Sequence, residues 1–219
     1  MYIKNLSVMN FRNLNNMTMD FSKGINIFYG DNAQGKTNIL ESIYFLSVLK
    51  SPRTSNNIEL INFDAEQAEI NANLIKSNTD IELDYVYTSE KKRELKINKV
   101  KTTPKNFKTV LKTVLFSTAD LLLLRGNPSD RRDWLDRAIS QVYPSYDDRL
   151  SKYYKIRVQK NNLLKDYLKT GSSNDTLLEV YNEQLVIAGS NIIYLRKKFL
   201  KEIEKIAKAS VTVSANVFS

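Results

Sequence analysis

One short stretch, GDNAQGKT at residues 30–37, constrains the fold of this 219-residue chain more than any other. It matches the pattern G-x-x-x-x-G-K-[ST] in full, and that pattern is specific when a strand precedes it and a helix follows. The apolar run at residues 24–30 predicts a buried strand. Residues 38–50 predict a helix whose apolar stripe comprises Ile39, Leu40, Ile43, Leu46 and Val48. The sequence therefore predicts a phosphate-binding loop of the P-loop α/β kind.

Each residue type in such a loop has a physical task. Successive backbone N–H groups point inward at a phosphate, and the N-terminus of the helix adds its positive end. Gly35 lets the backbone come close, Lys36 reaches the β- and γ-phosphates, and the Thr37 hydroxyl binds Mg²⁺. The loop residues predicted to bind the nucleotide are Gly30, Asp31, Asn32, Ala33, Gln34, Gly35, Lys36, Thr37 and Asn38.

Composition excludes several kinds of chemistry. The chain has no cysteine and no histidine, which removes disulfides, thiolate and imidazole metal ligands, and Ser-His-Asp or Cys-His catalysis. A metal ion would need oxygen ligands, which favours Mg²⁺. The net charge of +9 favours a polyanion such as nucleic acid, although a charged, soluble surface gives the same number. The sequence contains neither a transmembrane run nor a secretory signal pattern, so we expect a cytoplasmic protein.

From about residue 66 the apolar period changes to two, which predicts an antiparallel β-meander with one solvated face. The charged residues 90–93 predict a hairpin tip, and residues 114–116 a further short strand. Residues 129–142 predict a helix. The residues expected to alternate inward along the strands are Ile70, Ala72, Leu74, Ile81, Leu83, Tyr85, Tyr87, Leu95 and Ile97, and those expected on the inner side of the helix are Trp134, Leu135, Ala138, Ile139 and Val142.

After Pro144 the pattern predicts two long helices. Their narrow apolar stripes favour an antiparallel helical hairpin over two helices packed on a globular core. Residues 170–175 supply a helix stop and N-cap candidates. We predict two domains, a head lobe at 1–143 and a helical arm at 144–219, with a terminal strand at 210–215. The stripe residues are Tyr153, Ile156, Leu163 and Tyr167 in the first helix, and Leu178, Tyr181, Leu185, Ala188, Ile192, Leu195, Phe199 and Ile206 in the second.

Hydrolysis of a bound nucleotide needs a carboxylate beside Mg²⁺ and a group that positions water. Two apolar segments end in aspartate, residues 58–64 and 114–120, but both are interrupted by polar residues and neither ends in an Asp-Glu pair. We therefore assign no catalytic residue. The sequence predicts a nucleotide-binding chain without its own hydrolytic carboxylate.

Four segments together resemble the RecF family, bacterial DNA repair and recombination-mediator ATPases related to the heads of SMC, Rad50 and ABC ATPases. They are LSVMNFRN at 6–13, NAQGKTNILE at 32–41, KSPRTSNNIELI at 50–61 and LFSTADLLLLRGNPSDRRDWLD at 115–136. The last is long and specific. The resemblance implies an α/β fold: the N-terminal lobe of an ABC/SMC-type head with an antiparallel meander, plus the helical arm.

The chain departs from the family pattern in three respects. Pro52 stands where the family usually has His, and Thr118-Ala119 replaces Pro-Glu before Asp120. No Leu-Ser-x-Gly-Gln signature occurs, and no Walker B strand follows. Family members are considerably longer. The resemblance therefore implies an N-terminal fragment that is not an efficient ATPase alone.

The resemblance also implies a mechanism and partners. ATP would bind one head, a second head would cap it, and the homodimer would close on duplex DNA or single-strand/duplex junctions. RecR and RecO mediators are the implied protein partners, in DNA replication, repair and the SOS response at the bacterial nucleoid. Arg12 and Asn13 are implied to lie near the nucleotide, with a plain surface loop as the alternative.

Basic residues offer candidate DNA contacts, since phosphates need only point charges. Residues 151–210 hold twelve Lys or Arg and six Asp or Glu, a net charge of +6. A run of charge is more often a solvated face. The residues predicted to contact DNA are Lys91, Lys92, Arg93, Lys96, Arg196, Lys197 and Lys198.

Two other functions stay open at this point. One is a self-sufficient P-loop kinase or NTPase for a small substrate, which would need internal catalytic carboxylates. The other is a partner-docking module in which the helical hairpin binds a protein and the nucleotide is structural. Steep salt dependence of DNA binding would separate a DNA-binding ATPase from a docking module.

Overall fold

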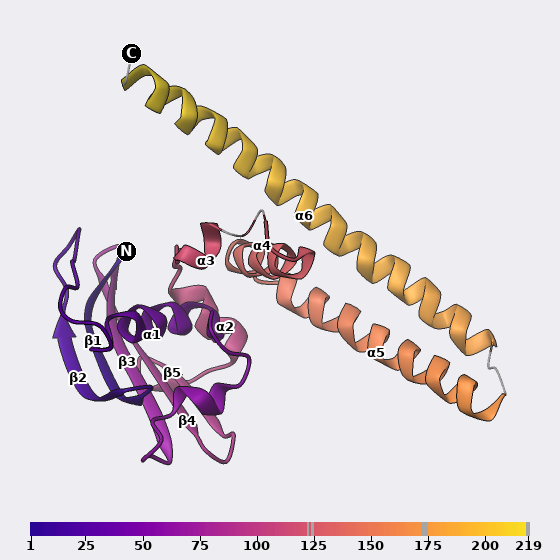
Figure 1. Ribbon diagram of the computed structural model, residues 1–219, viewed down its shortest axis with the longest axis horizontal. Coiled ribbons are helices and arrows are strands. Elements are labelled where there is room, and N and C mark those ends of the chain that lie inside the picture. The colour runs from indigo at the N-terminus through magenta and orange to yellow at the C-terminus, as the bar shows by residue number, and fades with distance from the viewer. Residues whose placement is uncertain (122, 124, 172–174, 218–219) are drawn as a thin grey trace. The chain divides into compact units, whose positions relative to one another are not determined.

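The computed structural model describes residues 1–121, 123, 125–171 and 175–217 (Figure 1). The chain forms two compact units, Met1–Asp120 and Leu121–Ser219. The first unit combines a β-sheet with helices, and the second is helical. The predicted domain boundary at 143/144 lies after helix α4 (Pro128–Val142), whereas the compact units divide before it, because α4 packs with the two long helices that follow.

The first unit contains one antiparallel sheet of six strands in the order β2-β1-β3-β4-β5-β6. This confirms the predicted antiparallel meander. The charged tip predicted at residues 90–93 lies at the turn between β4 and β5. The strands are β1 (Tyr2–Phe11), β2 (Leu14–Asp20), β3 (Gln67–Lys76), β4 (Thr79–Thr88), β5 (Arg93–Ile97) and β6 (Val100–Lys101).

Alternation of side chains explains why these segments become strands. Ile70 pairs with Tyr85 and Ala72 with Leu83 across β3 and β4, and all four are buried on the same face. Between them, Asn71 donates to Asp84 at 2.6 Å on the other face. Burial of one face fixes the register, since a slip of one residue would expose the whole apolar set.

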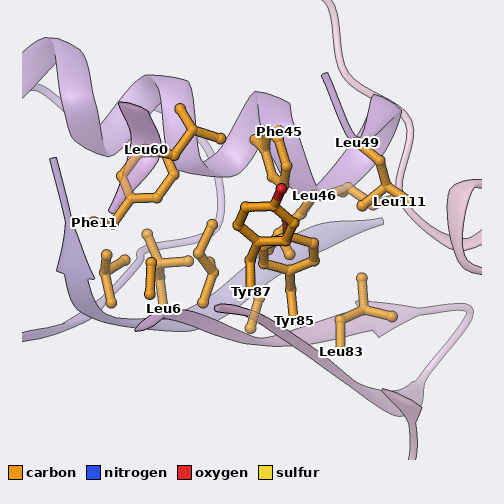
Figure 2. Packing of buried hydrophobic residues seen from close by; sticks show 14 of the residues in the cluster. Leu6, Phe11, Phe45, Leu46, Leu49, Leu60, Leu83, Tyr85, Tyr87 and Leu111 are labelled. Carbon is orange, nitrogen blue, oxygen red and sulfur yellow. The ribbon is translucent and has the colours of Figure 1, made fainter. Parts of the chain in front are cut away.

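Helix α1 (Lys36–Val48) covers the apolar face of the sheet. Figure 2 shows Phe45 and Leu46 facing the aromatic residues of β4. The ring of Phe45 lies 4.8 Å from that of Tyr85 at an interplanar angle of 71°, an edge-to-face pair worth about 1 kcal/mol beyond area burial. The helix was predicted, but Leu40 is exposed and not part of its buried face. Polar Glu41, Ser42 and Ser47 are buried instead.

Shorter helices complete the first unit. Helix α2 (Pro104–Val110) buries Phe107 in the same core, with Thr103 as its N-cap. The 3₁₀ helix η1 (Asn57–Leu60) lies beside the end of β1, where Phe11 bridges Ile61. Helix α3 (Thr118–Leu121) contains the boundary between the two units.

Two predicted strands do not form. Residues 24–30 are not in a strand, and Ile25, Ile27 and Tyr29 are 87%, 79% and 91% exposed. Residues 114–116 are likewise outside any strand, with Val114 97% exposed. Both predictions were wrong for the same reason. Within the part of the chain that the structure describes, no strand pairs with either segment, so most of their apolar side chains stay exposed. Phe28 is the exception, since it packs against Phe21 and the core of the first unit.

In the second unit, helices α5 (Tyr146–Thr170) and α6 (Asp175–Val217) run antiparallel side by side (Figure 1). This is the predicted helical hairpin. Gly171 ends α5, as predicted, and does so in the left-handed conformation. Of the predicted N-cap candidates, residues 172–174 lie outside the described residues, and Asp175 is the first residue of α6. The described helices include none long and apolar enough to cross a membrane.

The core of the second unit joins α4 to the hairpin. It contains Ile139, Tyr146, Ile192 and Phe199, with Leu135 and Ala138 packed against it. Three residues predicted to face inward do not: Val142 is 54%, Tyr167 is 45% and Ile206 is 67% exposed. The terminal strand predicted at 210–215 was also wrong, because α6 continues through that segment.

Candidate nucleotide-binding site

The loop of residues 30–37 leads directly into α1, as the sequence pattern predicted. Helix α1 begins at Lys36, and its N-cap Gly35 supplies no side-chain cap. The first N–H groups of a helix lack intrahelical partners, and the helix dipole makes this end positive. A pocket of about 560 Å³ opens here. It is lined by Arg12, Asn13, Asn32, Ala33, Gly35, Lys36, Thr37, Asn38, Arg53, Glu59, Ile61 and Phe63.

Gly35 is required at its position for two reasons. Its φ of 91° lies in the region that L side chains rarely adopt, and a Cβ there would come within 2.6 Å of Leu14 Cδ2. The loop can therefore approach the turn between β1 and β2 only with glycine at this point.

Lys36 folds back over its own loop. Its Nζ donates to the carbonyl oxygens of Gly30 at 2.8 Å and Asp31 at 2.5 Å. The ammonium is thereby held at the pocket, where it can exchange carbonyl partners for phosphate oxygens. Thr37 is exposed in the first turn of α1. Of the predicted loop residues, Gly30, Asp31 and Gln34 do not line the pocket.

Asn13 fastens the loop to the sheet. It occupies the tight turn between β1 and β2 and donates through Nδ2 to the carbonyl of Ala33 at 2.8 Å. Its Oδ1 accepts from Asn38 Nδ2 at 2.7 Å. The structure thus brings Asn13 and Asn38, two of the residues predicted to bind nucleotide, into direct contact.

Arg12, the other residue of that turn, is part of an ionic cluster beside the pocket. Its Nη2 lies 2.8 Å from Glu41 Oε1, and its Nη1 donates to the carbonyl of Glu59 at 2.9 Å. Arg53 also binds Glu41, with Nη1 3.0 Å from Oε2, and Ser51 donates its hydroxyl to the same carboxylate. Burial raises the pKa of Glu41, but these hydrogen bonds and charges outweigh burial and hold the pKa below its ordinary value.

Glu41, Ser51 and Arg53 were not predicted as site residues. The sequence carried a signal for each, since Glu41 ends one segment of the RecF resemblance, and Ser51 and Arg53 lie in another. Their mutual contact is invisible to helical or strand periodicity, because it joins a buried polar residue of α1 to a loop.

The carboxylates near the pocket are few. Among the described residues that line it, Glu59 alone carries a carboxylate. Asp120, at the end of one of the interrupted segments, caps α3 by accepting from the backbone N–H and hydroxyl of Ser117. The described residues contain no group of three or more acidic side chains placed to hold a metal ion. Mg²⁺ commonly keeps several waters and takes one or two protein ligands plus phosphate oxygens, and Thr37 fits that role.

The basic residues predicted to contact DNA fall into two sets. In the β4–β5 hairpin, Lys92 pairs with Glu90 at 2.6 Å, and Lys96 with Glu94 at 3.2 Å. Lys91 and Arg93 are exposed. These cations lie together on one hairpin, although carboxylates are interspersed among them.

The second set lies on α6, where the three residues differ. Lys197 is exposed, and Lys198 lies 5.3 Å from the centre of the Tyr143 ring. Arg196 instead donates to Asp136 and to the hydroxyl of Tyr146. Its guanidinium is therefore engaged inside the second unit.

Comparison with known proteins agrees with this geometry. The model of the AAA ATPase domain family matches residues 1–215. The DNA replication and repair protein RecF of Thermoanaerobacter sp. (strain X514) is 42% identical over 206 residues, which cover 93% of this chain and 56% of that protein. RecF of Bacillus subtilis (strain 168) is 38% identical over 95% of this chain and 56% of that protein. The chain spans about half the length of the curated relatives it matches.

Solved structures give the same result. The structure of the recombination mediator protein RecF with ATP, in the RecFOR pathway, matches with a TM-score of 0.87 at 33% identity, covering 93% of this chain and 55% of that one. An SMC ATPase structure matches with a TM-score of 0.53 at 19% identity, over 63% of this chain and 99% of that one, and shows a shared fold. The phosphate-loop pattern followed by α1, the antiparallel sheet and the family model that matches residues 1–215 lead to one conclusion: the chain belongs to the AAA ATPase domain family, and it is similar to RecF proteins over about half of their length.

Proposed function

We propose that this chain is the nucleotide-binding part of an ATP-dependent DNA-binding protein of recombinational DNA repair. The observation that supports it most is the combination of a complete phosphate loop, opening onto a pocket, with 42% identity to a RecF protein. ATP is the proposed nucleotide, since a RecF structure with ATP shares the fold at 33% identity. Mg²⁺ is the proposed metal, with Thr37 as its protein ligand.

The proposed binding residues follow the loop. Its N–H groups and the N-terminus of α1 would hold phosphate oxygens, while Lys36 would exchange its bonds to Gly30 and Asp31 for the terminal phosphates. Asn13 would keep the loop in this shape through Ala33 and Asn38. When bound, Mg²⁺ would neutralise phosphate charge and fix the nucleotide's orientation.

Turnover by this chain alone is proposed to be slow. A metal-bound nucleotide needs a carboxylate in its coordination shell and a group that positions water, and of the described pocket residues only Glu59 is acidic. In the longer protein, an ATP-dependent homodimer would supply the missing groups from a second head. Because each nucleotide site would be completed by the second chain, nucleotide binding would control the closing of the two heads on each other.

DNA is the proposed macromolecular partner, as duplex or at single-strand junctions, with RecR and RecO mediators as protein partners of the longer protein. The net charge of +9 and the cations of the β4–β5 hairpin support DNA binding. Lys91, Lys92, Arg93, Lys96, Lys197 and Lys198 are the proposed contacts on the present structure.

The proposal is tested by measuring Mg²⁺-ATP binding and ADP release by this chain, with and without duplex DNA. We expect binding with negligible ADP release, and loss of binding in Lys36→Ala with an unchanged melting temperature. Unchanged affinity in Lys36→Ala would remove the phosphate-loop assignment. Brisk ADP release without another chain would instead indicate a self-sufficient NTPase.

DNA binding is tested by its salt dependence. Release of counterions makes log K fall linearly with log salt, with a slope near −0.9 for each phosphate contacted. Replacing Lys91, Lys92 and Lys96 by Gln should reduce that slope by about one for each true contact. Binding that does not respond to salt, or an absence of DNA binding alongside capture of a protein partner, would favour the docking module.

A further inference from the structure

Glu41 is a buried carboxylate that faces away from solvent on α1, yet it does not belong to the apolar core. Its side chain is 1% exposed, and it accepts bonds from two arginines and a serine. Arg12 comes from the β1–β2 turn and Arg53 from the segment after α1, so a single carboxylate joins three parts of the first unit. A buried charge with this many partners is a strong geometric constraint.

Both arginines line the pocket, whereas Glu41 does not. Arg53 Nη1 also donates to Asn38 Oδ1 at 2.7 Å, one residue beyond Thr37. In a phosphate loop, the Ser/Thr that follows the lysine, here Thr37, lies at the end of the site that holds the metal ion and the terminal phosphates. Arg53 keeps half of its side chain exposed, 51%, so its remaining N–H groups are accessible at that end of the pocket.

Two opposite effects on anion binding follow from Glu41. As a negative charge near the pocket, it weakens anion binding through its field. As an anchor, it keeps two mutually repelling guanidinium groups at fixed positions beside the loop, which strengthens binding by removing the cost of ordering them. The two effects have opposite signs, so their balance can be measured.

We propose that Glu41 is a positioning residue of the nucleotide site, which holds Arg12 and Arg53 at the pocket so that the site prefers a nucleoside triphosphate to a diphosphate. This inference rests on the proposed nucleotide binding at the loop. The third phosphate is the group that gains from Arg53, because Arg53 lies toward Thr37 and Asn38. Glu41 acts through the two arginines and does not itself touch the nucleotide.

Three single variants separate the anchoring of the two arginines by Glu41 from the electrostatic field of its negative charge. Glu41→Gln removes the charge, Glu41→Asp keeps the charge but draws it back by one methylene, and Glu59→Gln removes an exposed carboxylate that lines the same pocket. Isothermal titration of the full 219-residue chain with Mg²⁺-ATP and Mg²⁺-ADP gives both affinities for each variant. Thermal melting of each variant reports on the fold.

The expected result is that both Glu41 variants lose about tenfold in ATP affinity, the worth of one charge-assisted hydrogen bond, with a smaller loss for ADP. Glu59→Gln should bind ATP slightly more tightly, because it only removes negative charge. In an Arg53→Met background, the effect of Glu41→Asp on ATP affinity should shrink to about twofold or less, since coupled residues are not additive.

Two outcomes would overturn the proposal. One is tighter ATP binding by Glu41→Gln together with wild-type binding by Glu41→Asp, which would make Glu41 a counter-charge only. The other is an equal loss for ATP and ADP that persists with Arg53→Met, which would make it a general support of α1. If Glu41→Gln does not fold, Glu41→Asp and the double variant still decide. Failure of the wild-type chain to bind ATP would reject the proposed function itself, and that result is distinct from all of these.

Discussion

Arg196 on α6 and Asp136 on α4 form an ion pair across the core of the second unit. Two guanidinium nitrogens of Arg196 contact the carboxylate. Nη2 lies 2.7 Å from Oδ1 and 2.9 Å from Oδ2, and Nε lies 3.0 Å from Oδ1. The buried hydroxyl of Tyr146 donates to Asp136 Oδ1 at 2.5 Å and accepts from Arg196 Nε. Burial, together with the neighbouring carboxylate, raises the pKa of Tyr146 well above its ordinary value. One polar cluster thus connects α4, α5 and α6.

Asp136→Asn should destabilise the second unit strongly. The amide retains the shape but leaves the guanidinium of Arg196 without its counter-charge, a loss of about 3 kcal/mol for a broken buried pair. Urea unfolding followed by helical circular dichroism measures it. Asp133→Asn, an exposed aspartate on the same helix, is the control and should change stability by less than about 0.5 kcal/mol. Equal effects of the two variants would contradict the role of the pair.

Gly35→Ala should abolish nucleotide binding by displacing the loop. The new Cβ would lie 2.6 Å from Leu14 Cδ2 and 3.1 Å from Asn13 Oδ1, and Asn13 is the residue that fastens the loop. Gly24→Ala is the matched control, since Gly24 also has positive φ, at 121°, but nothing lies within 4 Å of its Cβ. Backbone strain of about 1 kcal/mol is expected there, with ATP affinity unchanged. Titration calorimetry and thermal melting of both variants provide the comparison.

Tyr85→Phe should stabilise the first unit by about 1 kcal/mol. The Tyr85 hydroxyl is buried and has no hydrogen-bond partner among the described residues, so its desolvation is uncompensated. The aromatic packing on Phe45 is retained by phenylalanine. A loss of stability would show that the hydroxyl has a partner in solution. Tyr87→Phe serves as the comparison on the same strand.

The same residue predicts an alkaline limit to stability. Burial raises the pKa of Tyr85 above its ordinary value of 10.0. Above that pH the unfolded chain loses the proton first, so the folded state binds more protons and its stability falls as pH rises. Urea midpoints from about pH 8 to about pH 11 should show a shallower fall in Tyr85→Phe than in the wild type. Parallel profiles would contradict the assignment to Tyr85.

A double substitution in the exposed segment, Ile25→Lys with Ile27→Lys, should leave the fold intact and reduce self-association. Both side chains are more than three-quarters exposed, so little burial is lost, and surface changes usually stay within about 0.5 kcal/mol. Exposed apolar side chains grouped in one segment favour association. Sedimentation at rising concentration measures the second effect. A lower melting temperature would show that these residues are packed in solution.

The elements that the sequence predicted well are those whose partners lie in the same chain. The alternation of Ile70, Leu83 and Tyr85 reflects burial against α1, and the heptad positions Ile192 and Phe199 reflect packing against α4 and α5. The passage of the loop at 30–37 into α1 was predicted because its pattern is a local one, and its binding of a nucleotide stays a prediction. The domain boundary at 143/144 and the roles of individual basic residues stay predictions.

The residues that were mispredicted show the limit of periodicity. An apolar pattern records that a segment is suited to burial, not that a neighbour exists to bury it. Ile25, Ile27 and Val114 have strand-like patterns but no strand beside them in the described chain, and Ile206 continues its stripe past the partner helix. The buried polar residues Glu41 and Asp136 carry no periodic signal, since their partners lie up to sixty residues away.

The loop at residues 30–37 lies in the chain between strands of one sheet, and this has a consequence for folding and for how binding can be measured. Strand β1 pairs with β2 on one side and β3 on the other, and the residues between β2 and β3 include the loop and α1. The loop closed by pairing β1 with β3 therefore contains all residues of the proposed nucleotide site. The conformational entropy lost on closing it is lost once, for the sheet and the proposed site together. A ligand that binds only the ordered loop should also stabilise the pairing of β1 with β3. Hydrogen exchange of the backbone amides that pair β1 with β3 should therefore be slower when the proposed site is occupied. That measurement reports on binding without any substitution in the site.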